Sequence, residues 1–164
     1  SRSAKGNGLG LSIAKELVSV HTVRLAELKI DYCSACYACK TIGHCVKRDD
    51  MERLLAKIRS AYVIVLATPV YFYTMCAQLK TMIDRTLGGA QQSGLENKEF
   101  YFIATAADGK AAMERTIDGL RGYIECLPGA VEKGVIYGAG AWQLGDIQGN
   151  PAMQEAYRMG NGIR

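Results

Sequence analysis

Four cysteines stand within thirteen residues of this 164-residue chain, at Cys33, Cys36, Cys39 and Cys45. Thiolates this close together can surround one metal centre, so zinc, an iron–sulfur cluster and free thiols are the alternatives. The first three match the C-x2-C-x2-C run of two-cluster ferredoxins, but the fourth follows after five residues and no proline comes next. The spacing therefore indicates four candidate metal ligands in a loop at about residues 32–48, and it leaves the metal open.

The chain opens with hydroxyl, guanidinium and glycine groups ahead of an apolar helical pattern. Backbone N–H groups of such a loop lie at the positive end of a helix dipole, and Ser or Arg side chains add hydrogen bonds to a phosphate. The loop is neither a Walker A sequence nor a complete dinucleotide fingerprint, and an unstructured polar N-terminus is the alternative. The candidate phosphate-binding residues are Ser1, Arg2, Ser3, Gly6, Asn7, Gly8 and Leu9.

Two more candidate loops follow apolar segments. Segment 62–67 runs into Thr68-Pro69, where we expect the proline to end a strand, and three aromatic residues follow that could flank a flat ring. Segment 100–104 runs into small residues that let a ligand approach the backbone. Core aromatics and a plain turn are the alternatives. The candidates are Pro69, Val70, Tyr71, Phe72 and Tyr73 in the first loop, and Thr105, Ala106, Ala107, Asp108 and Gly109 in the second.

Strand and helix patterns alternate along the chain. Strands are predicted at 62–67, 100–104 and 134–137, with a weaker one at 22–28, and helices at 51–58, 79–87, 113–127 and from Asn150-Pro151 onward. Continuous apolar strands alternating with helices predict a parallel sheet covered on both faces, with segment 22–28 at its edge. Ligands of such sheets bind at the carboxyl ends of the strands, where the candidate loops would meet.

A glycine-rich loop of this kind normally follows a first, central strand, yet the given sequence begins with the loop itself. The link between the first helical pattern and segment 22–28 is also short and contains no glycine to turn it. We therefore expect residues to be missing before Ser1 and near Val20.

Length and composition predict one domain, residues 1–164, with an ordinary core. The start has no apolar signal-peptide region, and no apolar run is long enough to span a bilayer. Net charge is +4, but Lys and Arg are interleaved with Asp and Glu, which argues against nucleic-acid binding. We expect a cytoplasmic protein with no membrane contact, in which the six cysteines stay reduced.

Taken together, these motifs resemble the flavodoxin-like NAD(P)H-dependent FMN reductases, and in particular their iron–sulfur flavoprotein branch. The resemblance covers most of the chain. The family's loop of S-x-R followed by G-N fits the start of the chain approximately, and its P-V-Y-F segment followed by L-K-x-x-I-D-R fits residues 69–72 and 79–85. Its cysteine-rich segment, a short basic stretch and D-D-M fit residues 33–51.

The resemblance implies a flavodoxin-like, doubly wound parallel sheet of order 2-1-3-4-5, with helices on both faces and FMN at the switch point. It implies that the FMN phosphate lies on residues 1–9, the isoalloxazine ring against residues 69–73, and the ring's far edge against residues 105–109. No side chain would be catalytic, because the flavin performs the electron chemistry. Lys80, Asp84 and Arg85 would be structural rather than catalytic, and the Asp and the Arg would form an ordinary surface pair or cap.

The implied function is an FMN-dependent oxidoreductase that takes hydride from NAD(P)H and passes electrons to a quinone, a flavin or a redox protein. The alternatives are an electron carrier with a [4Fe–4S] cluster on Cys33, Cys36, Cys39 and Cys45, or a zinc-binding interaction module without yellow colour. A phosphate-binding regulator without redox activity would use only the first loop. The family further implies small-molecule donors and acceptors as partners and a homodimer or homotetramer.

Overall fold

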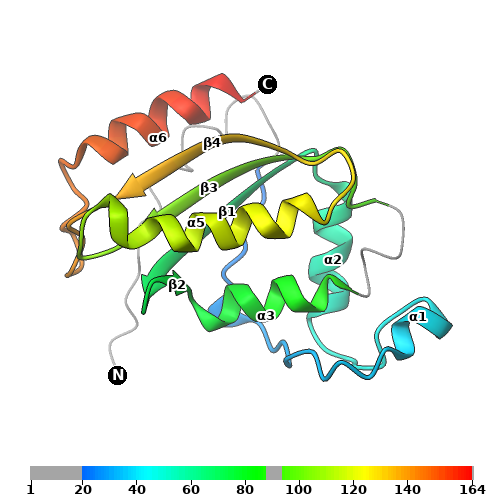
Figure 1. Ribbon diagram of the computed structural model, residues 1–164. Coiled ribbons are helices and arrows are strands. Elements are labelled where there is room, and N and C mark those ends of the chain that lie inside the picture. The colour runs from blue at the N-terminus through cyan, green and yellow to red at the C-terminus, as the bar shows by residue number, and fades with distance from the viewer. Residues whose placement is uncertain (1–19, 88–93, 164) are drawn as a thin grey trace.

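The computed structural model describes residues 20–87 and 94–163, in which a parallel sheet is flanked by helices (Figure 1). Strands β1 (Val63–Tyr71), β3 (Glu99–Thr105) and β4 (Val131–Gly138) run parallel, with β3 between the other two. The short β2 (Thr74–Met75) turns back antiparallel on β1, which makes the order β2-β1-β3-β4. The three stronger predicted strands are confirmed, and each is longer than its apolar run.

Strand β1 continues through Pro69 to Tyr71, so the prediction that this proline ends the strand is wrong. Pro69 pairs with Thr105 on one side, and the β2 hairpin contacts β1 only from Val70 onward. Proline is tolerated in a strand where its missing N–H faces no ladder partner. The extension carries β1 directly into the predicted aromatic loop.

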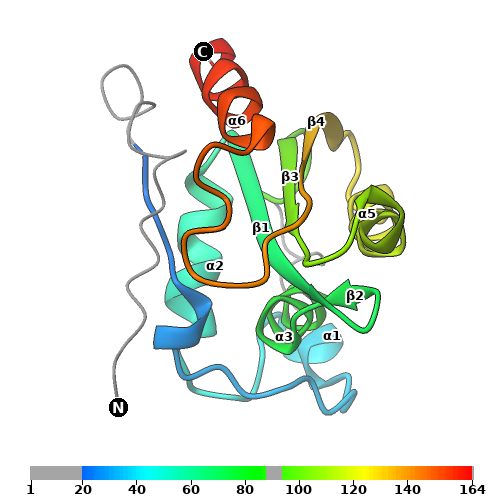
Figure 2. The same ribbon diagram turned by 90° about the vertical axis from the view of Figure 1, so that its left-hand side faces the viewer.

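The predicted helices form as α2 (Met51–Ser60), α3 (Ala77–Arg85), α5 (Lys110–Glu125) and α6 (Pro151–Gly162). Figure 2 shows α5 and α6 on opposite faces of the sheet. The Asn150 side chain accepts a hydrogen bond from the Ala152 N–H and so begins α6 as the sequence predicted. In the described residues no helix is long and apolar enough to cross a bilayer.

The largest part of the core lies between the sheet and the helices α2, α3 and α5. Phe100 and Phe102 of β3 meet Met113, Ile117 and Leu120 of α5, and none of the five is more than 1% exposed. Each such side chain contributes roughly 1.5–3 kcal/mol through removal from water. This packing fixes the strands, and therefore the loops that follow them.

The predicted edge strand at 22–28 is not formed. This segment instead contains a 3-10 turn, η3 (Leu25–Glu27), closed by a hydrogen bond from the Leu28 N–H to the Leu25 carbonyl. Its apolar side chains, among them Val23 and Leu28, pack against the helical side of the core. An extended segment can bury apolar side chains without pairing with a strand, and segment 22–28 does so by packing against the core.

Candidate functional site

Two of the predicted loops meet where the parallel strands end, a rim that we call the carboxyl edge. Pro69 of β1 pairs with Thr105 of β3, and Thr105 pairs with Gly138 of β4. Residues 69–73 and 105–109 therefore emerge side by side, as the sequence predicted. The predicted phosphate-binding residues, from Ser1 to Leu9, lie outside the described part of the chain.

Two aromatic residues form the turn of the β1–β2 hairpin at this edge. Tyr71 pairs with Thr74, so Phe72 and Tyr73 are the central residues of a two-residue turn, with φ of 51° and 64°. Asn and Gly usually occupy such left-handed positions, because a larger side chain is strained there. Phe72 is also 99% exposed. Strain together with an exposed ring indicates a functional position rather than a packing position.

The hairpin is fastened to the helix that follows it. The Thr68 hydroxyl accepts a hydrogen bond from the Cys76 N–H at 3.0 Å and donates one to the Pro69 carbonyl at 2.7 Å. On the outer side, the Arg115 guanidinium of α5 lies 5.5 Å from the centre of the Tyr73 ring. The aromatic turn is thus held from both sides while its outer surface stays open.

The second loop is joined by hydrogen bonds to the chain that follows β4. The Ala106 N–H donates to the Gly138 carbonyl at 3.1 Å, and the Ala141 N–H donates to the Ala106 carbonyl at 2.9 Å. The Gly140 N–H donates to the Asp108 carbonyl at 3.3 Å. Ala107, Asp108 and Gly109 remain exposed on a backbone that is held in place from behind.

The segment after β4 forms a turn at the same edge of the sheet. A Cβ atom at Gly138 would lie 2.9 Å from Thr105 Cγ2, so this position has no room for a side chain. Further along, the Asp146 carboxylate accepts hydrogen bonds from the N–H groups of Trp142 and Gln143, at 3.0 and 2.6 Å. The resulting turn presents an exposed Trp142 ring close to where β4 ends.

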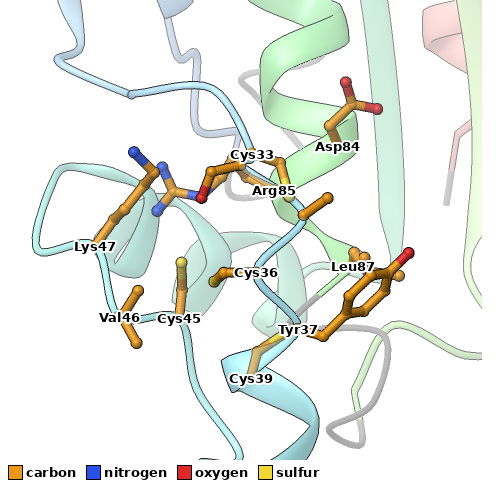
Figure 3. A pocket seen from close by; sticks show the side chains of 12 residues that line it. Cys33, Cys36, Tyr37, Cys39, Cys45, Val46, Lys47, Asp84, Arg85 and Leu87 are labelled. Carbon is orange, nitrogen blue, oxygen red and sulfur yellow. The ribbon is translucent and has the colours of Figure 1, made fainter.

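The four cysteines of the predicted metal loop line one cavity, which we call the cysteine pocket (Figure 3). Cys33 and Cys36 lie before the short α1 (Ala38–Ile42), Cys39 lies within it and Cys45 follows it. Within residues 20–87 and 94–163, no three His, Cys, Asp or Glu side chains converge closely enough to hold one metal ion. The pocket therefore gathers the thiols without closing them around a single centre.

The backbone between these cysteines is unusually wound. Ala35 and Tyr37 have φ of 52° and 56°, a left-handed conformation that non-glycine residues seldom adopt. Successive turns of opposite hand point backbone N–H groups inward and form anion-binding concavities that recur at iron–sulfur sites. A hydrogen bond from the Ala38 N–H is the largest influence on Cys36, and the pKa of this thiol lies below its ordinary value.

An ion pair closes the base of the cysteine loop. Arg85, at the end of α3, donates to the Asp49 carboxylate at 2.6 and 3.0 Å and to the Asp31 carbonyl at 2.6 Å. The same carboxylate accepts hydrogen bonds from the N–H groups of Asp31 and Met51. One arginine thus ties together both ends of segment 31–49, and it also lines the cysteine pocket.

Comparison with known proteins places this architecture in a family. The family model of NADPH-dependent FMN reductases matches residues 6–132, which is more than half of the chain. The chain belongs to this family. An iron–sulfur flavoprotein of Methanosarcina thermophila is 30% identical over 154 residues, a match that covers 93% of this chain and 78% of that protein.

A second iron–sulfur flavoprotein, from Archaeoglobus fulgidus, is 39% identical over 79 residues, or 48% of this chain, and the match spans only 36% of that relative's length. These relatives place the chain in the iron–sulfur flavoprotein branch of the FMN reductases. Among solved structures, azoreductase AzrA superposes with a TM-score of 0.71 at 16% identity, covering 94% of this chain and 87% of that one. The fold is accordingly flavodoxin-like, as the sequence predicted.

The carboxyl edge of this FMN reductase family member fits a flat cofactor. Phe72 offers an exposed aromatic face. Gly138, where a side chain would collide with Thr105, leaves the end of β4 without a side chain. The exposed backbone of residues 107–109 supplies groups of the kind that contact a ring edge.

The two candidate sites lie at opposite ends of helix α3. The aromatic hairpin immediately precedes α3, whereas Arg85 at its last turn lines the cysteine pocket. Figure 1 shows β2 at one end of α3 and α1 beyond the other. A nine-residue helix is about 14 Å long, so the sites do not merge.

Arg85 is the residue whose position sequence reasoning missed. The expected surface pair between Asp84 and Arg85 is not formed, because Asp84 pairs with Lys80 one helical turn away. Arg85 instead belongs to the buried face of α3 together with Leu79 and Met82. The available signal was its place three residues after Met82, on an apolar face where a cation needs a partner.

Proposed function

We propose that this chain is an FMN-dependent oxidoreductase that holds the flavin ring at the carboxyl edge, between the aromatic hairpin and residues 105–109. The single observation that carries the proposal is the strained, exposed Phe72–Tyr73 turn beside the end of β3. Membership of the FMN reductase family supports FMN as the cofactor. Residues 1–9 would hold the phosphate, as the resemblance implies.

FMN, when bound, accepts hydride from NAD(P)H and releases electrons to a second acceptor such as a quinone, a flavin or a redox protein. The protein's own residues orient and shield the ring. Tyr71 and Phe72 would cover part of one face of the ring, and the fixed backbone of residues 107–109 would lie at its edge. Thr68 keeps the hairpin in place. We assign no acid–base side chain, because this chemistry does not need one.

Flavin titration of matched aromatic variants tests the proposal. Tyr71 stands at the carboxyl end of β1, whereas Tyr62 precedes β1 at the opposite end and is 86% exposed. We expect Phe72→Ala and Tyr71→Ala each to weaken FMN binding about tenfold, which corresponds to one lost ring contact of about 1.4 kcal/mol. Tyr62→Ala should bind FMN like the wild type. Equal affinities for all three variants would place the flavin elsewhere.

We also propose that Cys33, Cys36, Cys39 and Cys45 hold a [4Fe–4S] cluster. Each thiolate of a [4Fe–4S] cluster binds a different iron atom, and the four thiols that line this one pocket match that number. The left-handed residues between the cysteines and the nearby guanidinium favour a group of negative charge. The relatives are named iron–sulfur flavoproteins, which also supports a cluster.

Iron and acid-labile sulfide in anaerobically purified protein test the cluster. We expect about four of each per chain in the wild type. Cys39→Ser should lose most of both, whereas Cys126→Ser, an exposed cysteine at the end of α5, should lose neither. FMN content should stay the same in both variants, because the hairpin lies at the other end of α3. Stoichiometric zinc without iron would support the zinc-binding alternative instead.

We further propose that the chain forms a homodimer or homotetramer. Phe72, Trp142 and Leu144 are all strongly exposed and belong to segments that follow strand ends at the carboxyl edge. Large apolar side chains gathered in this way commonly mark an interface. Light scattering coupled to size-exclusion chromatography gives the mass directly, and a monomer at micromolar concentration would refute this proposal.

A further inference from the structure

The cysteine pocket contains a buried cation whose hydrogen bonding is incomplete. The Arg85 side chain is 1% exposed, and its two Nη atoms make three hydrogen bonds, two to Asp49 and one to the Asp31 carbonyl. Its Nε atom is also buried and has no partner among the described residues. A buried N–H group without an acceptor is costly, so it needs an explanation.

The pocket itself offers that explanation. Arg85 lines the same cavity as the four cysteines, and Figure 3 shows it beside Cys33 with Cys45 facing the same space. Asp49 pairs with this guanidinium at 2.6 Å, and an arginine side chain is not deprotonated in proteins. A positive charge therefore lies next to the thiols.

Asp49 does not fully neutralise the positive charge of Arg85. Its carboxylate also accepts the N–H groups of Asp31 and Met51, so it shares its negative charge with three partners. Lys47, which pairs with Asp31 at 3.7 Å, adds a second positive charge to the pocket lining. The lining also contains one carboxylate, Asp84, which pairs with Lys80 on the same helix. The two cations outnumber this single anion, so the lining favours a negatively charged occupant.

We propose that Arg85 is a positioning residue of the cysteine pocket with two tasks. Its Nη atoms close the base of the cysteine loop, and its charge and Nε–H group stabilise negative charge on the group that the thiolates hold. The inference rests on the proposed function, in which that group is an iron–sulfur cluster. A reduced cluster carries one more negative charge than an oxidised one, so Arg85 favours the reduced form.

The midpoint potential of the cluster tests this, measured by an anaerobic titration followed by electron paramagnetic resonance. Arg85→Gln removes the charge and should make the potential more negative, and Arg85→Lys should shift it less in the same direction. Asp49→Asn keeps Arg85 but removes the neighbouring anion, so it should shift the potential in the opposite, positive direction. A role limited to holding the loop predicts no shift in Arg85→Gln, because the charge of Arg85 would then not act on the cluster.

Arg121→Lys is the matched control. Arg121 makes a similar two-bond contact to the Glu132 carboxylate, at 2.8 and 3.1 Å, but it lies on α5 and does not line the cysteine pocket. Its replacement should leave the potential unchanged. FMN content, recorded for every variant, should equal that of the wild type.

The outcomes separate the inference from the function on which it rests. Wild-type protein that takes up no iron overturns both the cluster proposal and the role of Arg85. A wild-type cluster whose potential is the same in Arg85→Gln and Asp49→Asn overturns only the role of Arg85. If Arg85→Gln takes up no iron, Arg85→Lys decides: a more negative potential supports the role, and an unchanged or more positive potential overturns it. If neither Arg85 variant takes up iron, Arg85 only closes the loop and the electrostatic task is overturned.

Discussion

Asp49 and Arg85 form an ion pair that water scarcely reaches, with side chains 11% and 1% exposed. Pairs of this kind contribute little compared with an apolar replacement, but removing one partner leaves a buried charge uncompensated. Burial alone would raise the pKa of Asp49, whereas hydrogen bonds from Arg85 and from two backbone N–H groups bring it below its ordinary value. The pair is therefore a contribution to stability that depends on pH.

The direction of that dependence follows from the lowered pKa of Asp49. Ionised Asp49 stabilises the fold above the unfolded-state value near 3.8, and this stabilisation disappears as the pH falls through the lower folded-state value. We expect Asp49→Asn to lower the free energy of unfolding by about 3–5 kcal/mol at pH 7 and by much less at pH 2–3. Urea denaturation at several pH values measures the difference.

Asp118→Asn serves as the control for this titration. Asp118 pairs with Arg121 on the surface and its side chain is 70% exposed, so its removal should change the free energy of unfolding by less than about 1 kcal/mol at any pH. A difference between wild type and Asp49→Asn that does not change between pH 7 and pH 3 would show that the carboxylate charge is not the stabilising feature.

At the scale of elements, the β1–β2 hairpin carries the clearest conflict between local preference and position. Phe72 and Tyr73 occupy left-handed conformations that Asn and Gly adopt more easily. Sequence patterns gave no hint of this turn, because nothing in a run of aromatic residues indicates positive φ. The strain is tolerated because Thr68 and the start of α3 hold the hairpin from behind.

Replacing both residues of this turn should separate stability from binding. We expect the double variant Phe72→Asn with Tyr73→Gly to raise the free energy of unfolding by about 1–2 kcal/mol, because the turn loses its strain. The same change should weaken FMN binding, because an exposed ring is lost. Thermal unfolding and fluorescence titration with FMN give the two quantities, and tighter or unchanged FMN binding would contradict the proposed role of the hairpin.

Elements with strong local signals were predictable, and elements defined by their neighbours were not. Helix α6 could be located from Asn150-Pro151, because the capping chemistry is contained in adjacent residues. Segment 22–28 looked like a strand, but whether an extended segment pairs with a sheet or packs against a helix depends on its neighbours. The continuation of β1 through Pro69 was missed for the same reason.

For the molecule as a whole, parallel strands explain why distant segments meet. Residues 69 and 105 could be predicted to share an edge, because every strand in such a sheet ends on the same side. The distance between that edge and the cysteine pocket could not be predicted, because it depends on the direction and length of α3. The predicted grouping of the residues at 69–73 with those at 105–109 is confirmed, whereas residues 1–9 lie outside the described part of the chain.

The two sites at opposite ends of α3 also differ in the chemical groups that they present. One end presents exposed aromatic rings and backbone, which suit a flat neutral ring system, and the other presents thiols around a buried cation. A change in one site is therefore expected to leave the occupancy of the other unaltered, and the potential of each to be set by its own surroundings.

The most direct test of this account is the absorption spectrum of the protein, purified without oxygen and loaded with FMN, before and after NADPH and then NADH are added. The account predicts flavin absorbance that bleaches on addition of at least one of the two donors and returns when an electron acceptor follows. A colourless protein that takes up no added FMN, or a bound flavin that neither donor reduces, would contradict it.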